Sequence, residues 1–139
     1  MKKVLRTAVV GVGAATVCFA LAQPALAGSF SKNVGDGTVK YTDSTDKFCA
    51  QARNFGGMPV EGTRRTVTVK LTPISGSGPR YKWTDEYGWK NGSKKSKTWG
   101  ATCRSLATAY EDTKYRAEVW SYWENRGTTV KRGTYTFHS

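Results

Sequence analysis

The stretch RRTVTVKLT, residues 64–72, decides the fold of this chain. Its apolar residues Val67, Val69 and Leu71 alternate with polar ones. Alternation with a period of two gives a β-strand one apolar face and one wet face. We therefore expect a half-buried strand here and a β-sheet around it.

Segments of similar character follow along the chain, rich in Thr, Tyr, Trp and Val and separated by Gly, Ser, Asn and Asp. We predict strands at 80–85, 114–124 and 129–138, and shorter ones at 37–42 and 98–103. The run Ser44-Thr45-Asp46 before Phe48, Ala52 and Phe55, with Gly56-Gly57 after it, resembles a short helix with an N-cap and a glycine stop, and 105–112 fits a single helical turn. Six or seven short strands predict an all-β fold, a small antiparallel two-sheet sandwich.

The first 27 residues have the pattern of a cleaved secretory signal peptide of bacterial style. Lys2, Lys3 and Arg6 precede an uncharged stretch that ends in Ala-Leu-Ala at 25–27. The stretch approaches the length of a membrane helix, but Pro24 and the small residues favour cleavage. We expect a secreted domain at 28–139, with no membrane span. It keeps 19 basic and 10 acidic side chains, a net charge of +9.

Cys49 and Cys103 are the two cysteines of that domain. Two cysteines in an exported protein favour a disulfide, which would close a loop of about 54 residues and stabilise the fold by roughly 4 kcal/mol. A metal or redox role lacks support, because the spacing is long and His138 is the only histidine.

The segment 111–119, with Tyr115 after an acidic corner, resembles the entry to a late strand of an immunoglobulin-type domain. Trp83 resembles the core tryptophan of an earlier strand. The cysteine that the immunoglobulin pattern places two residues after the tyrosine is Ala117 here. The resemblance implies an immunoglobulin-like general architecture and carries no activity.

Four lysines surround an Asn91-Gly92 pair within residues 86–99. Asn-Gly between extended arms is typical of a hairpin tip, so the lysines would project into solvent and attract an anionic polymer. A solvated loop or a protected sheet edge is the alternative reading. The candidate ligand-binding residues are Trp89, Lys90, Lys94, Lys95, Lys97 and Trp99.

The chain holds five Trp, seven Tyr and five Phe, more than a core of this size readily needs. In the strand at 114–124, Trp120 and Tyr122 share a face with Arg116 rather than with Val119. Flat rings beside polar groups stack on sugars or nucleobases, and arginine adds cation–π contacts. Arg116, Trp120 and Tyr122 therefore join the candidates, unless a loop or the second sheet covers this face.

The sequence shows no strong pattern of catalytic residues. Adjacent carboxylates such as Asp85-Glu86 point to opposite faces of a strand, whereas a glycosidase needs two that face each other. The position of His138 does not suit a Ser-His-Asp device, and oxidation removes both cysteines as nucleophiles. We expect a non-enzymatic protein with no metal and no cofactor.

The leading hypothesis is a secreted domain that binds an anionic polymer or cell-wall glycan, with teichoic acid and extracellular nucleic acid among the polymers considered. The alternative is a secreted protein-interaction factor: an inhibitor of an extracellular enzyme, or a small antibacterial toxin. A small cell-wall hydrolase, with Glu118 or Asp85 as its acid, ranks third.

Overall fold

The computed structural model describes residues 28–53, 64–88 and 100–139, so the signal peptide predicted at 1–27 lies outside the described residues. The elements are β1 (Phe30–Asn33), β2 (Gly37–Thr42), a 3-10 turn (Asp43–Thr45), β3 (Lys47–Ala52), β4 (Arg65–Ser75), β5 (Tyr81–Tyr87), β6 (Thr102–Ser105), β7 (Lys114–Trp123) and β8 (Thr128–His138).

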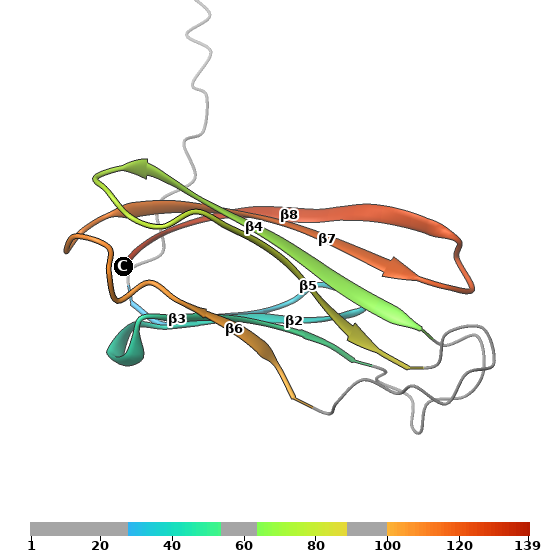
Figure 1. Cartoon of the computed structure of the whole chain (residues 1–139). Coiled ribbons are helices and arrows are strands. Elements are labelled where there is room, and N and C mark those ends of the chain that lie inside the picture. Colours follow the sequence, from blue (N-terminus) through green and yellow to red (C-terminus); the bar gives the residue numbers. More distant parts are fainter. Residues whose placement is uncertain (1–27, 54–63, 89–99) are drawn as a thin grey trace, which may run out of the picture.

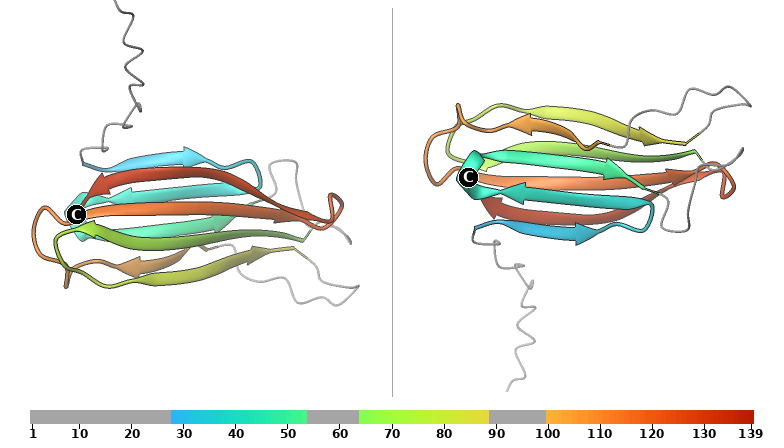
Figure 2. Two further views of the ribbon diagram at one scale, coloured as in Figure 1. Left: turned by 90° about the horizontal axis from the view of Figure 1, so that it is seen from above. Right: turned by 90° about the horizontal axis from the view of Figure 1, so that it is seen from below.

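These strands form two antiparallel four-stranded sheets, ordered β1-β2-β3-β6 and β5-β4-β7-β8. Figure 1 shows the sheets as two packed layers, and Figure 2 shows that their strands run along one common long axis. The predicted all-β sandwich is therefore confirmed.

The stretch that alternates most clearly becomes β4, a central strand that pairs with both β5 and β7. Val69 lies opposite Trp83 on one side and Val119 on the other. All three side chains are buried between the sheets. The even-numbered residues of β4 point to the other side of the sheet, as the period of two predicts.

Of the two helical segments predicted, the first is helical only in a 3-10 turn at Asp43–Thr45, and the second, at 105–112, is not helical. Residues 47–52 form β3, and Phe48, Ala50 and Ala52 are its buried face. β3 pairs with β2 and with β6, and this pairing overrides the local preference for a helix. The connection after β6 is built from turns and crosses to the other sheet with Leu106 buried.

Aromatic rings fill the space between the sheets. Tyr41, Phe48, Tyr115 and Phe137 are fully buried. Phe30 belongs to β1, a strand that the sequence did not predict, and its ring centroid lies 5.6 to 6.2 Å from four neighbouring rings. β1 therefore closes one side of the aromatic core.

The predicted Cys49–Cys103 disulfide is present, and its two residues lie directly opposite each other in β3 and β6. It joins neighbours within one sheet, whereas the immunoglobulin disulfide bridges the two sheets. Trp83 is buried and packs edge-on against Phe48. The Tyr115 hydroxyl donates to a carbonyl 36 residues upstream, at Pro79, rather than to a nearby one. The general architecture is shared with immunoglobulin domains, but the disulfide and this tyrosine contact are arranged differently.

Candidate binding face

The β5-β4-β7-β8 sheet has one side that points away from the second sheet, and we call this side the outer face. Seen from above in Figure 2, no described element lies over it. Arg116, Trp120 and Tyr122 lie on this face, from β7. The second sheet packs against the opposite face, so the reading in which it covers these residues does not hold. Arg116 is exposed, whereas the two rings are half-buried.

Trp120 occupies the middle of the outer face. Lys131 on β8 holds its Nζ 5.7 Å from the Trp120 ring centroid. On the other side lies Thr68, whose hydroxyl is 2.8 Å from that of Thr84. The ring is therefore flanked by a cation and by a row of hydroxyl groups.

Tyr122 lies two residues further along the same strand, under a second cation. Arg64 places its Cζ 5.8 Å from the Tyr122 ring centroid and is held by an ion pair of 2.7 Å with Glu86. The two rings thus form a short row along β7, each accompanied by a basic side chain.

The charge of this face is positive. Its cations include Arg64, Lys70, Lys82, Arg116 and Lys131, and its anions include Glu86 and Glu118. Glu118 lies between Lys131 at 3.3 Å and Lys70 at 3.9 Å. Both lysines are half exposed, at 52% and 51%, so they remain accessible to a ligand.

The other six candidate residues lie outside the described residues: Trp89, Lys90, Lys94, Lys95, Lys97 and Trp99. The lysine-rich hairpin loop therefore stays a prediction. The chain leaves the described fold after Gly88 and rejoins it at Gly100.

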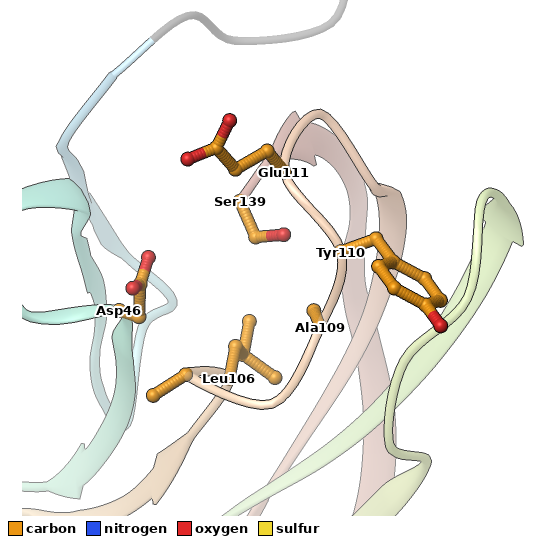
Figure 3. A pocket seen from close by; sticks show the side chains of 7 residues that line it. Asp46, Leu106, Ala109, Tyr110, Glu111 and Ser139 are labelled. Carbon is orange, nitrogen blue, oxygen red and sulfur yellow. The ribbon is translucent and has the colours of Figure 1, made fainter.

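A cavity of about 210 Å³ lies beside the C-terminal residue, between the β2–β3 turn and the β6–β7 connection. Figure 3 shows the carboxylates of Asp46 and Glu111 at its sides, Leu106 below them, and the Tyr110 ring turned away. Asp46 accepts a hydrogen bond from the Tyr41 hydroxyl at 3.3 Å, and burial together with this carboxylate raises the pKa of Tyr41. Two carboxylates make the cavity unsuitable for an anionic polymer.

The two carboxylates considered for hydrolysis do not face each other. Asp85 is buried between the sheets, where it accepts hydrogen bonds from the Ala52 amide at 2.7 Å and the Thr102 hydroxyl at 2.6 Å. Glu118 lies on the outer face of the same sheet. These two cannot flank one glycosidic bond.

A cluster that sequence reasoning missed lies where β1 turns into β2. Asp36 is buried and accepts hydrogen bonds from Arg65 at 2.9 Å, Arg126 at 2.8 Å, Arg132 at 3.1 Å and the Ser121 hydroxyl. We call these five residues the arginine cluster. They are scattered from 36 to 132, so only the closed sandwich brings them together.

Electrostatics within the arginine cluster favour an ionised Asp36. Burial alone would raise the pKa of its carboxyl group. The hydrogen bonds from Arg126, Ser121 and Arg132 outweigh burial and lower the pKa from 3.8 to about 2. Asp36 is therefore a carboxylate at every physiological pH.

Among the described residues, no three His, Cys, Asp or Glu side chains are grouped as metal ligands would be. The described part of the chain also contains no helix of the length and apolar character needed to cross a membrane.

Comparisons with family models, with curated proteins and with solved structures found no match to this chain.

Proposed function

We propose that this chain is a secreted, non-catalytic domain whose outer face binds an extended anionic or glycan polymer outside the cell. One observation carries the proposal: Trp120 and Tyr122 form a row on a face that no described element covers, and a cation accompanies each ring. The leader-like sequence and the disulfide support an extracellular location.

The chemistry of the outer face suits such a ligand. Apolar ring surface provides stacking with sugar rings or bases, worth about 1 to 3 kcal/mol for each base in single-stranded complexes. Lysine and arginine attract the charged groups of a polyanion. Threonine hydroxyls beside Trp120 can donate to and accept from sugar hydroxyls. A sheet face that no described element covers also leaves both ends of a chain-like ligand free to continue.

The test is retention of the purified, disulfide-bonded protein on insoluble wall polysaccharides, anionic wall fractions and DNA over a salt series. We expect retention on the anionic members, and on glycan if stacking dominates. Trp120→Ala should weaken retention about ten-fold, which corresponds to the loss of one stacked ring.

Tyr110→Ser supplies the control, since Tyr110 is the most exposed aromatic side chain described, at 74%, and lies in the connection between β6 and β7 rather than on a strand of the outer face. Its loss should leave retention unchanged. The proposal is refuted if no polymer retains the wild type at low salt, or if the two variants bind equally well.

A further inference from the structure

The arginine cluster holds more positive charge than its one carboxylate can neutralise. Arg65, Arg126 and Arg132 all pair with Asp36, and among the described residues no second carboxylate lies within ion-pair distance of these three groups. The cluster therefore carries a net charge of +2. One arginine would suffice to balance a buried aspartate, so two cations remain for another partner.

Some hydrogen-bond donors of the cluster have no partner among the described residues. Arg126 donates from Nε to Thr128 and from Nη2 to Asp36 and Ser121. Arg132 donates from Nε to the Ser121 hydroxyl and from Nη2 to Asp36. Neither Nη1 group donates to any described residue. Both side chains are 27% exposed, so solvent and small ions reach them.

The two guanidinium groups converge. Their Nη2 atoms donate to the same oxygen, Oδ2 of Asp36, at 2.8 and 3.1 Å. Because both groups bond one oxygen, their Nη2 atoms are close neighbours, and a small anion beside them would meet both guanidinium groups. Planar guanidinium forks match the oxygen edges of such an anion in pairs.

Arg132 is directed into the cluster by the backbone. The register between β7 and β8 shifts between Val119 and Trp120, which makes Arg132 the extra residue of a β-bulge. Bulges re-aim a side chain and are frequent both at sheet edges, such as β8, and next to active sites. The guanidinium lies against Gly35, where a Cβ atom would come within 2.9 Å of Arg132 Cζ. The group is thus positioned before any ligand arrives, which lowers the entropy that binding costs.

We propose that Arg126 and Arg132 form a binding site for a tetrahedral oxyanion, with the chemistry of a phosphate or sulfate group. Asp36 and Ser121 hold the two guanidinium groups in place, and the Nη1 groups contact the anion oxygens. This site is separate from the outer-face rings and does not rest on the function proposed for them.

The experiment titrates sodium phosphate into the purified, isotope-labelled protein while sodium chloride keeps the ionic strength constant. We expect a saturable response, and we expect the Nε–Hε signals of Arg126 and Arg132 to shift in nitrogen–proton spectra. This readout needs no variant. A response that does not saturate, or that shifts signals elsewhere and leaves these two unmoved, overturns the proposal.

Variants make the test independent of total charge. Arg126→Lys and Arg132→Lys keep the cation and one bond to Asp36 but lose the fork, so each should weaken phosphate binding about five-fold or more. Arg116→Lys, a matched exchange on the outer face, should bind phosphate as the wild type does. Equal affinity in all three variants would contradict the assignment.

The source of the oxyanion is decided by a competing ligand. The competitor is a short glycerol-phosphate oligomer. If it displaces phosphate and its affinity per phosphate group exceeds that of free phosphate, the natural ligand is a phosphate group carried by a polymer. Binding of free phosphate without displacement by the oligomer identifies a free-ion site. Trp120→Ala should leave phosphate affinity unchanged, so failure here and failure of the proposed function are separable.

Discussion

Asp36 ties the β1–β2 turn to β4, β7 and β8 through one buried carboxylate. Replacing it with Asn keeps the shape but leaves three arginines without their counter-charge. We expect Asp36→Asn to lower the free energy of unfolding by about 3 kcal/mol, since removing one partner of a buried ion pair leaves the other charge uncompensated. Urea denaturation at neutral pH measures the effect. Glu111→Gln, an exposed acid at the cavity, should change stability by less than about 0.5 kcal/mol, and equal losses in both variants would contradict this role.

The same carboxylate makes stability depend on pH. Its pKa is lowered from 3.8 to about 2, so its contribution is fully present above 3.8 and is lost as the pH falls through about 2. The shift corresponds to about 2 kcal/mol. Between about pH 6 and pH 2 the wild type should therefore lose about 2 kcal/mol more than Asp36→Asn. Parallel pH profiles for the two proteins would assign the acid sensitivity to other carboxylates.

No sequence pattern points to Asp36. It stands in Val-Gly-Asp-Gly, which is typical of a solvated turn, and its arginine partners lie up to 96 positions away. The positions of Trp120 and Tyr122 were predictable because side-chain parity along a strand is fixed once the strand is identified. The contacts of Arg64 and Lys131 with these rings could not be predicted, because the register of neighbouring strands and the bulge in β8 decide which residues meet.

At the scale of single elements, β6 depends on contacts beyond its own ladder. It is four residues long, and among the described strands it pairs only with β3. The disulfide fixes it from one side, while β5 donates side-chain hydrogen bonds from Tyr81 to Ser105 and from Trp83 to Thr102, at 3.0 and 3.1 Å. Removing the disulfide or either hydrogen bond should therefore destabilise the pairing of β6 before that of the central strands.

We expect the Cys49→Ser, Cys103→Ser double variant to lose about 2 to 4 kcal/mol of stability. Hydrogen exchange should show the β6 amides losing protection first, while those of β4 and β7 follow global unfolding. Tyr81→Phe, which removes one hydrogen bond, should cost only about 1 kcal/mol. Unchanged protection of β6 in the double variant would show that the side-chain bonds alone hold this strand.

The elements also show which parts of the fold a single sequence specifies. β4, β5, β7 and β8 follow clear alternation or strong turn signals, and all four were predicted. β3 reads locally as a capped helix, and only its position between β2 and β6 makes it a strand. β1 is four residues long with three exposed, so it has no periodic signal apart from Phe30.

Taken as a whole, the molecule has two broad outer surfaces that differ in chemistry. The outer face carries the Trp120 and Tyr122 rings together with basic residues. The opposite surface, formed by β1, β2, β3 and β6, presents exposed Lys40 and Lys47, and the described strands contribute no aromatic side chain to it. The net charge of the molecule alone would attract a polyanion to both surfaces equally. Because only the outer face carries the aromatic row, we predict that a polyanion prefers the outer face.

A charge-matched comparison tests that preference. Lys82→Ser with Lys131→Ser removes two cations from the outer face, and Lys40→Ser with Lys47→Ser removes two from the opposite surface, so both proteins have the same net charge. We expect the first variant to bind an anionic polymer more weakly and to flatten the dependence of log affinity on log salt by about one to two units, because fewer counterions are released. The second should keep most of the wild-type affinity and slope. If both lose affinity equally, attraction is set by the charge of the whole molecule, and the outer face has no special part in it.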